Sequence, residues 1–242
     1  MGDKATIGTV GVIKPVNESI SHPQLESIMP DGVAFESVHL GVQYRSIAEF
    51  REVMALYEES VPEMAARGVD LLHPEGAPPF MLEGLGGERD RIKAWEDRFQ
   101  IPVFTTGITQ LAAMEALGIR KFVGVTPFSG ELADVFRNYF EEAGLEVQAM
   151  TTPVPPPDSI YDRPAEEVLG LVVAAFKAYG AGAEALYLLG SDWPVFEIAG
   201  EIEEEIGVPV LHPVPVRCWY IQKRLGLNQP VPGYGRLLAD MV

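Results

Sequence analysis

The chain has little cysteine, few basic residues and no long apolar run. Its single cysteine, Cys218, cannot form a disulfide within the chain, which favours a cytoplasmic protein and excludes a cysteine-based metal cluster. The four histidines show no HxH or HxxxH spacing, so we expect no metal site. No apolar run approaches the ~18 residues that span a bilayer, and the N-terminus lacks the pattern of a signal peptide.

Positive charge is also scarce, because the chain has 35 acidic and only 18 basic residues, which gives a formal net charge of -17 at pH 7. Such a surface repels nucleic acids and anionic membranes, so we expect neither as a partner. An acidic protein can still hold a locally positive site. A small-molecule carboxylic acid or a derivative of one is therefore compatible with this charge, and so is a homo-oligomer.

Short apolar runs rich in β-branched residues alternate with amphipathic stretches of helical length. Strands are expected over residues 5–13, 33–40, 69–73, 101–106, 121–126, 145–150, 185–190 and 208–212. Helices are expected over 46–67, 86–99, 108–118, 129–144, 164–179, 194–206 and 214–225. This alternation is typical of an α/β fold with a parallel sheet covered on both faces. "GLGG" (84–87) is expected to form a turn, and 150–164 a proline-rich surface loop.

Two segments share a pattern. "GVDLLHPEGAPPF" (68–80) and "GAEALYLLGSDWPVF" (182–196) each have a glycine, an acidic residue two positions later and an apolar strand. Each strand ends at a second glycine, Gly76 or Gly190, and a proline and a phenylalanine follow. The pattern predicts two similar open-sheet halves. Ligands of open parallel sheets bind at the carboxyl ends of the strands, so these loops are the first candidates for a site.

Three titratable residues stand at predicted strand ends. His73 and Glu75 end the first of the two segments, and His212 follows the last predicted strand. An imidazole or a carboxylate in such a place can act as a general acid or base. Each residue also has a structural alternative: Glu75 as a solvated loop residue, His73 as a donor to a backbone carbonyl, and His212 as a packed strand-end residue.

The second segment adds a hydroxyl, a carboxylate and an indole. Ser191 and Asp192 are candidates for nucleophilic or acid–base chemistry, although no GxSxG motif surrounds Ser191. Alternatively, both residues cap a helix that begins near Pro194. Trp193 lines an aromatic substrate pocket in one interpretation and the protein core in the other.

Several segments carry a resemblance to a known family. They are "IGTVGVIKPVNES", "GVDLLHPEGAPPF", "ALGIRKFVGVTPFSGELADVFRNYFEEAGLEV", "EIEEEIGVPVLHPVPVRCW" and "PGYGRLL". Together they resemble the arylmalonate decarboxylases and maleate cis-trans isomerases of the aspartate/glutamate/hydantoin racemase superfamily. The resemblance implies two pseudosymmetric α/β lobes, each an open, mostly parallel sheet with helices on both faces. We expect a first lobe of residues 1–106 plus 212–242, a second lobe of 107–211, and the active-site cleft between them.

The resemblance further implies cofactor-free chemistry at a carbon next to a carboxylate, with a cysteine at one or both central strand ends. In this chain the first such position is Gly76, as in arylmalonate decarboxylases. The second falls on Gly190, or on Ser191 if the alignment slips by one residue. Cys218 lies on the expected last helix, away from both strand ends, and we expect it to be a buried small hydrophobic residue.

Other pocket positions also differ from the family pattern. Ala77 and Pro78 stand where the family has hydroxyl residues, Phe128 replaces a tyrosine, and Asn17 matches the isomerase asparagine with a one-residue difference in spacing. Together with Gly76, Gly190 and Trp193, the residues Asn17, Ala77 and Phe128 form the expected substrate-binding set.

The sequence therefore predicts a cofactor-independent enzyme, decarboxylase- or isomerase-like, that acts on a small carboxylic acid without a catalytic thiol. One alternative is a hydrolase or lyase that uses the same cleft, with Glu75, His73, His212 or Ser191 activating water. A second alternative is a non-catalytic carboxylate-binding protein. Titratable residues at both strand ends count against it.

Overall fold

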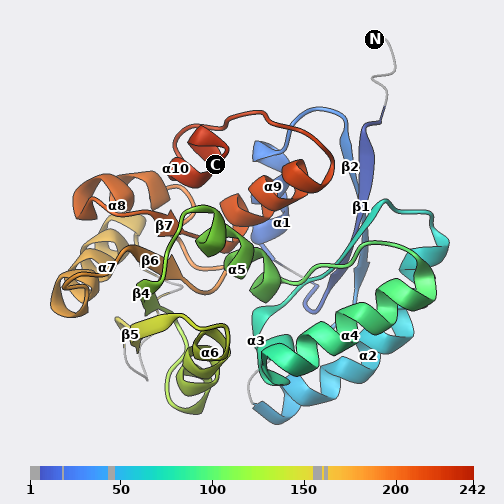
Figure 1. Ribbon diagram of the computed structural model, residues 1–242, viewed down its shortest axis with the longest axis horizontal. Coiled ribbons are helices and arrows are strands. Elements are labelled where there is room, and N and C mark those ends of the chain that lie inside the picture. The colour runs from blue at the N-terminus through green and yellow to red at the C-terminus, as the bar shows by residue number, and fades with distance from the viewer. Residues whose placement is uncertain (1–5, 18, 43–46, 155–159, 161–162) are drawn as a thin grey trace. The chain divides into compact units, whose positions relative to one another are not determined.

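The computed structural model describes residues 6–17, 19–42, 47–154, 160 and 163–242 (Figure 1). The chain divides into two compact units, Met1–Ser19 with Met29–Ile108 and Ile20–Ile28 with Thr109–Val242. These units differ from the predicted lobes in the placement of 20–28, 107–108 and 212–242, and the division into lobes stays a prediction.

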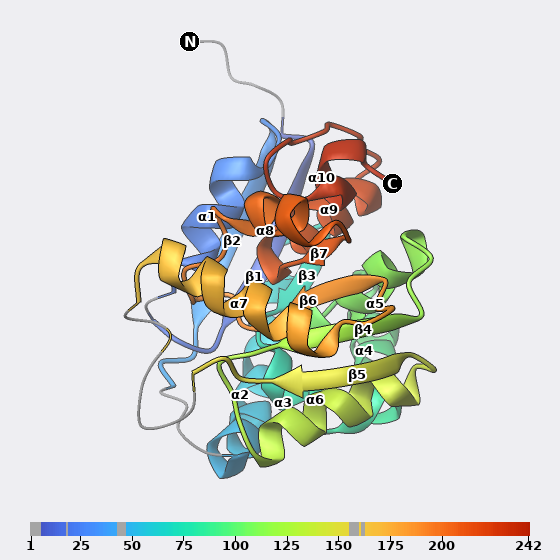
Figure 2. The same ribbon diagram turned by 90° about the vertical axis from the view of Figure 1, so that its left-hand side faces the viewer.

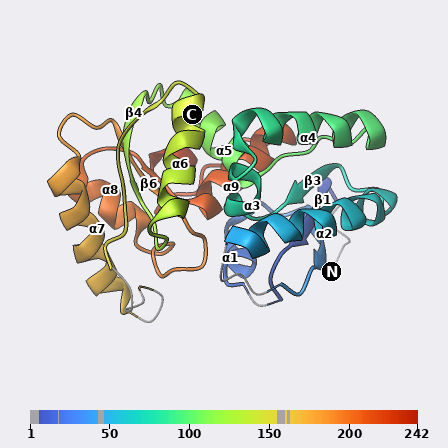
Figure 3. The same ribbon diagram turned by 90° about the horizontal axis from the view of Figure 1, so that it is seen from below.

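The first unit has a three-stranded parallel sheet in the order β2-β1-β3. An isolated parallel bridge from Leu72 to Val103 adds a fourth position beside β3. Helix α2 packs on all three strands, and α4 lies alongside α2 (Figure 3). The elements are β1 (Gly8–Lys14), β2 (Val33–His39), α2 (Ile47–Ala66), β3 (Leu71–Pro74), α3 (Ala77–Met81) and α4 (Gly84–Phe99).

The second unit has a four-stranded parallel sheet in the order β5-β4-β6-β7. Helix α7 packs on β4, β5 and α8 (Figure 2), and α1 packs on α9. Helix α5 (Thr106–Ala116) runs from the first unit into this one. The other elements are α1 (Ser21–Ile28), β4 (Lys121–Val125), α6 (Glu131–Glu142), β5 (Glu146–Thr151), α7 (Ala165–Tyr179), β6 (Ala185–Leu188), α8 (Ala199–Ile206), β7 (Val210–Leu211), α9 (Pro213–Arg224) and α10 (Arg236–Asp240).

Two parallel sheets flanked by helices confirm the predicted α/β class, and most expected strands and helices form close to the predicted places. Three expectations were wrong. Residues 101–106 make only the bridge at Val103, because α5 already begins at Thr106. "GLGG" opens α4 instead of forming a turn, and the helix expected from Pro194 begins only at Ala199. The short helices α1, α3 and α10 were not predicted.

The repeated sequence pattern corresponds to repeated backbone geometry. Gly68 and Gly182 have φ of +75° and +76°, and Gly76 and Gly190 have φ of +121° and +116°. A side chain rarely tolerates such angles, which explains why glycine recurs at these positions. Counting the bridge at Val103, each unit also has its strands in the same spatial order, with the first strand between the second and the third.

The acidic residue of each repeat ties down the start of the first strand in its unit. The Asp70 carboxylate accepts a hydrogen bond from the Thr9 amide at 2.8 Å. The Glu184 carboxylate accepts from the amides of Arg120 at 2.6 Å and Lys121 at 3.0 Å. These two backbone donors lower the pKa of Glu184 below its usual value. The acid in the pattern is therefore structural in both units.

No helix among the described residues combines the length and apolar character that a membrane span requires. Within the same residues, histidine, cysteine and carboxylate side chains form no group of three suited to a metal ion.

Candidate active site

In the first unit, strand β3 leads directly into a buried carboxyl residue and a glycine turn. The Glu75 amide donates to the Ile13 carbonyl at 2.9 Å, which extends the pairing of β3 with β1 by one step. Glu75 is only 6% exposed, so the solvated-loop alternative was wrong. Gly76 then turns the chain into α3 with its positive φ. The strand end therefore places a carboxyl side chain where little solvent reaches it.

An aromatic cluster supports this strand end. The Tyr57 hydroxyl, from α2, donates a hydrogen bond to the Glu75 carbonyl. The ring of Tyr57 lies 5.1 Å from that of Phe80, and Phe80 meets Trp95 edge-on at 6.2 Å. Tyr57 and Phe80 are fully buried, and Trp95 is nearly so. The backbone on either side of Gly76 thus rests on three packed rings. No sequence pattern connected Tyr57 with this site, because it lies on α2, 18 residues before Glu75.

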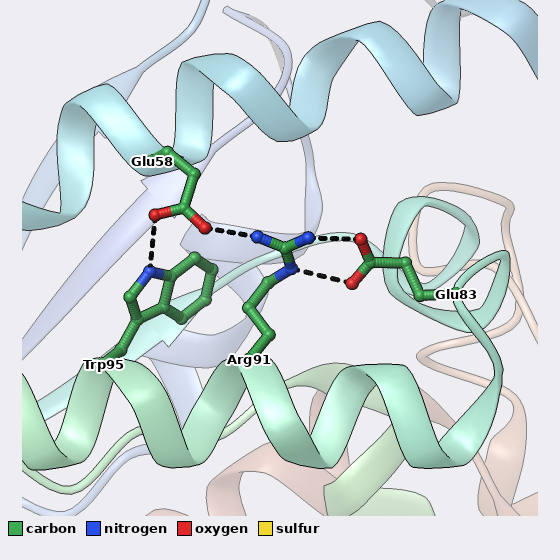
Figure 4. A network of polar contacts seen from close by, with 4 residues as sticks. All are labelled: Glu58, Glu83, Arg91 and Trp95. Atoms are coloured by element: carbon green, nitrogen blue, oxygen red, sulfur yellow. Dashed lines mark hydrogen bonds and ion pairs between the residues drawn. The ribbon is translucent and has the colours of Figure 1, made fainter.

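A polar network holds the outer side of that cluster (Figure 4). The Trp95 indole donates to Glu58 at 2.9 Å, and Arg91 bonds to Glu58 and, through two nitrogens, to Glu83. These carboxylates raise the pKa of Arg91 further above its ordinary value. The network joins α4 to α2 and thereby fixes Trp95 behind Phe80 and Tyr57.

His73 has the surroundings of a structural histidine. It is fully buried in β3, its Nδ1 lies 2.9 Å from the Phe104 carbonyl, and the two rings stack at 4.6 Å. Because a carbonyl only accepts, Nδ1 carries the proton of this hydrogen bond. These contacts support the structural alternative for His73, in which it bonds a backbone carbonyl.

Helix α3 begins directly after Gly76. Pro78 and Pro79 occupy its first turn, where an amide would have no partner within the helix. This explains why two consecutive prolines are tolerated. Because proline has no N–H, neither position offers a backbone donor. Ala77 is 9% exposed, whereas Asn17 lies exposed after β1, near Gly41.

In the second unit, β6 leads into Gly190. The Leu189 amide donates to the Val125 carbonyl at 2.9 Å, matching the bond made by Glu75 in the first unit. A Cβ atom at Gly190 would lie 3.1 Å from Pro127 and 3.3 Å from Trp193. Both the positive φ and the close packing therefore require glycine. Ser191, the next residue, is partly exposed.

The register of the strands pairs Gly190, not Ser191, with Gly76. The Leu72 amide donates to the Pro102 carbonyl, and the Leu186 amide donates to the Pro209 carbonyl, each at 2.9 Å. Four residues after Leu72 and Leu186 stand Gly76 and Gly190. Within the internal repeat, these two glycines occupy the same place.

Asp192 does not cap the helix that follows it, as one interpretation had expected for Ser191 and Asp192. Helix α8 begins at Ala199, with Ile198 as its N-cap residue, and the residues between form turns. The Asp192 carboxylate instead accepts from the Ser21 amide at 3.3 Å, at the start of α1. A helix N-terminus attracts a carboxylate, so this contact anchors α1.

Two aromatic residues of the expected binding set pack within the second unit. Trp193 is fully buried in a cluster that includes Val125 and Leu188. Phe128 is partly buried, and its ring meets Phe136 of α6 edge-on at 5.7 Å. Trp193 therefore has the position of a core residue, while Phe128 keeps part of its surface accessible.

His212 directly follows β7 and is 1% exposed. Its Nδ1 accepts from the Val214 amide at 3.4 Å as the N-cap of α9. Burial and the nearby charge of Arg217 lower the pKa of His212 to about 3. The nearby Gly190 backbone raises this pKa, but by less. A neutral imidazole near pH 7 is a poor proton carrier but a good hydrogen-bonding group.

The single cysteine is buried, and its thiol is hydrogen-bonded. Cys218 is fully buried on α9, and its Sγ donates to the Ile28 carbonyl at the end of α1, 3.4 Å away. Burial raises the pKa of Cys218 to about 12. It therefore remains a protonated thiol that joins α9 to α1.

Comparisons with known proteins agree with this architecture. The arylmalonate decarboxylase family model matches residues 10–238. Maleate isomerase of Pseudomonas putida is 24% identical over 219 residues, which cover 88% of this chain and 87% of that protein. Its name denotes an enzyme that acts on a small carboxylic acid.

Two solved structures show the same fold. A liganded double mutant of arylmalonate decarboxylase has a TM-score of 0.85 at 18% identity, covering 96% of this chain and 99% of that one. A mutant of Nocardia farcinica maleate cis-trans isomerase, bearing a covalently bound succinylcysteine intermediate, has a TM-score of 0.84 at 22% identity, covering 96% and 98%. The fold matches these enzymes over nearly the whole chain, and the family model covers residues 10–238. The chain therefore belongs to the arylmalonate decarboxylase family.

Proposed function

We propose that this family member is a cofactor-independent enzyme that acts on a small carboxylic acid at the carbon next to the carboxylate, without a catalytic thiol. The observation that carries the proposal is the state of Cys218, which is the only cysteine in the chain. It is fully buried, its pKa is raised to about 12, and its Sγ is bonded to the Ile28 carbonyl.

The absence of an available thiol favours one kind of reaction within the family. Isomerisation of maleate through a covalent adduct needs a nucleophile that adds to the double bond, as the succinylcysteine in the Nocardia farcinica enzyme illustrates. Decarboxylation of a malonate needs none. The bond to the leaving carboxylate breaks, CO₂ departs, and its electron pair forms an enediolate that then takes up one proton at carbon. We therefore favour decarboxylation, or proton exchange at the same carbon.

Glu75 is our candidate for the proton carrier. Its carboxyl group is buried at the end of β3, and its backbone is held by the Ile13 carbonyl and the Tyr57 hydroxyl. A protonated Glu75 would deliver its proton to the enediolate carbon and recover one from solvent. His212 stays neutral and suits hydrogen bonding to an oxygen of the substrate. Gly76 and Ala77 of the first unit, and Gly190 and Phe128 of the second, remain proposed substrate-binding residues.

A substrate screen by proton NMR in D₂O tests the reaction type. The panel contains aryl- and alkylmalonates, maleate, amides and lactones. We expect a malonate to lose CO₂ and to gain one deuterium at the α-carbon. Hydrolysis of an amide or lactone without deuterium at carbon would replace this proposal with the hydrolase alternative. Saturable binding without turnover of any compound would replace it with the carboxylate-binding alternative.

The Glu75→Gln variant tests the role of Glu75. Turnover of the malonate should fall by about 10²-fold or more, because glutamine cannot carry the proton. The matched control is Glu36→Gln in the same unit, which alters a surface ion pair with Arg67 and should leave turnover unchanged. Equal rates for the wild type and Glu75→Gln would remove Glu75 from the mechanism.

A further inference from the structure

The segment Gly233–Arg236, which we call the C-terminal strap, packs tightly against α8 and β7 of the second unit. A Cβ atom on Gly200 of α8 would lie 2.4 Å from the Gly233 carbonyl oxygen. A Cβ atom on Gly235 would lie 3.2 Å from the Val210 carbonyl oxygen, and Gly235 has a φ of +90°. The fit leaves no room for side chains at Gly200 and Gly235, so the strap has a defined position on the unit.

One buried carboxylate joins the strap to β7. Glu203 of α8 is 8% exposed, and its Oε1 accepts from the amide and Nε of Arg236 at 3.0 and 2.8 Å. Its Oε2 accepts from the amide of Val210 at 2.9 Å. Val210 is the first residue of the two-residue strand that leads into His212. Glu203 thus connects the strap to the strand that positions the imidazole.

An aromatic stack forms a second connection. The Tyr234 ring of the strap lies 4.6 Å from the Phe196 ring, with 25° between the planes. Phe196 in turn lies 6.2 Å from the His212 ring. Phe196 is 3% exposed and His212 is 1% exposed, so the two rings nearest the end of β7 are buried. The strap therefore supports His212 both through the backbone of β7 and through Phe196.

The hydrogen bond at Nδ1 defines which nitrogen of His212 carries the proton. Nδ1 accepts from the Val214 amide, so the neutral ring carries its proton on Nε2. Nε2 is buried and makes no well-formed hydrogen bond among the described residues, although the Gly190 backbone lies close enough to the ring to favour its protonated form. A buried polar group without a partner is unfavourable, and a ligand that supplies the acceptor removes this cost.

We propose that Glu203 and Tyr234 are positioning residues, which hold His212 so that its Nε2–H donates a hydrogen bond to a carboxylate or enediolate oxygen of the substrate. The identity of the substrate in this inference rests on the proposed function, whereas the orientation of the ring does not. In this role the strap holds His212 and does not itself contact the substrate.

Four variants test the positioning role. Glu203→Gln removes a charge-assisted bond, and Tyr234→Ala removes the stack; each should lower kcat of the malonate reaction about tenfold, because small misplacements of a binding group are costly. Tyr234→Phe keeps the stack and should restore wild-type kcat. Glu205→Gln on the same helix alters only an exposed ion pair with Lys177 and is the matched control. If Glu203→Gln does not fold, Arg236→Ala replaces it, because that arginine side chain is 43% exposed.

The ring of His212 gives a readout that does not depend on activity. In ¹H–¹⁵N spectra the imidazole assigned by His212→Gln should show the Nε2–H tautomer in the wild type and Tyr234→Phe. It should show exchange broadening or mixed tautomers in Tyr234→Ala. An unchanged His212 signal together with unchanged kcat in Tyr234→Ala and Glu203→Gln would overturn the inference, even if Tm falls. The expected spectra without turnover of any carboxylic acid would instead overturn the proposed function and leave the positioning intact.

Discussion

The two strand ends share a backbone plan and differ in the side chains placed on it. In each unit the third strand bonds once more to the first strand, at Glu75 or Leu189, and then turns at a glycine of positive φ. The first unit puts a buried carboxyl at that step and the second puts an apolar residue. The same turn thus carries different side chains in the two units, and only the first unit places a group suited to proton transfer there.

At the fourth strand position of each unit, the second unit carries the more chemically versatile group. Thr105 and His212 each follow a Pro-Val-x segment and stand directly before a helix, α5 or α9. Each side chain accepts a hydrogen bond from a backbone amide in the first turn of that helix. Threonine is an ordinary helix cap, whereas imidazole adds a second nitrogen that remains available. The second unit therefore places a neutral donor where the first unit has only a cap.

The largest expected effect comes from adding a methyl group at each glycine turn. Both Gly76→Ala and Gly190→Ala strain a backbone at positive φ, which costs about 1–3 kcal/mol. At Gly190 the methyl also meets Pro127 at 3.1 and 3.2 Å, whereas at Gly76 its close contact is the Tyr57 hydroxyl at 3.1 Å. We expect Gly190→Ala to lower the free energy of unfolding by about 3 kcal/mol or more, and Gly76→Ala by less.

Urea unfolding of the two variants measures this difference. Gly86→Ala in α4 is the control, because a Cβ atom there meets nothing within 4 Å and stability should stay equal or rise slightly. Equal losses at Gly76 and Gly190 would mean that backbone strain alone, without side-chain packing, sets the cost at both turns.

A smaller effect should appear in the acid stability of the second unit. The pKa of His212 is about 3 in the folded protein and 6.5 without the fold. The folded state therefore binds fewer protons between these values. Stability is full above about pH 6.5 and falls as the pH drops toward 3, at up to about 1.4 kcal/mol per pH unit.

The comparison of wild type with His212→Gln isolates this contribution. Between about pH 7.5 and about pH 5, the wild type should lose about 2 kcal/mol more unfolding free energy than the variant. Most carboxylates stay ionised in this pH range, so their titration contributes little to the difference. Parallel stability curves for the two proteins would show that the imidazole takes up its proton equally in the folded and unfolded states, contrary to its burial.

The smallest expected effect concerns Cys218, which lies on α9 and not at either strand end. With a pKa of about 12, Cys218 has on the order of one thiolate in 10⁴ molecules near pH 8. Iodoacetamide should leave the native protein unlabelled and its activity unchanged, and should label the urea-unfolded chain fully. Inactivation that follows labelling of Cys218 would contradict a thiol-free mechanism.

Much of the fold followed from local sequence. Alternating apolar and amphipathic stretches predicted a parallel α/β sheet, because strands buried on both faces must be apolar along their whole length. The shared pattern of 68–80 and 182–196 predicted two such halves. The paired glycines could also be recognised, since a positive φ excludes most side chains whatever the surroundings. Boundaries were less certain where a short turn replaced an expected helix, as between Pro194 and Ala199.

The candidate site depended on partners far apart in the chain. Asp192 had a reasonable local role as a cap, yet its carboxylate receives the amide of Ser21, 171 positions away. Tyr57 supports Glu75 from a helix whose pattern showed only amphipathicity. In both cases the partner is chosen by packing in space, and spacing along the chain carries no information about it.

The parallel α/β class, the acidic surface, the paired glycines and the single cysteine can be recognised from the sequence, because composition, periodicity and backbone sterics are local properties. The burial of Glu75, the lowered pKa of His212 and the contact of the strap with β7 through Glu203 become visible only in the folded protein. Burial, desolvation and long-range hydrogen bonds arise when distant segments meet, so these properties exist only in the folded chain.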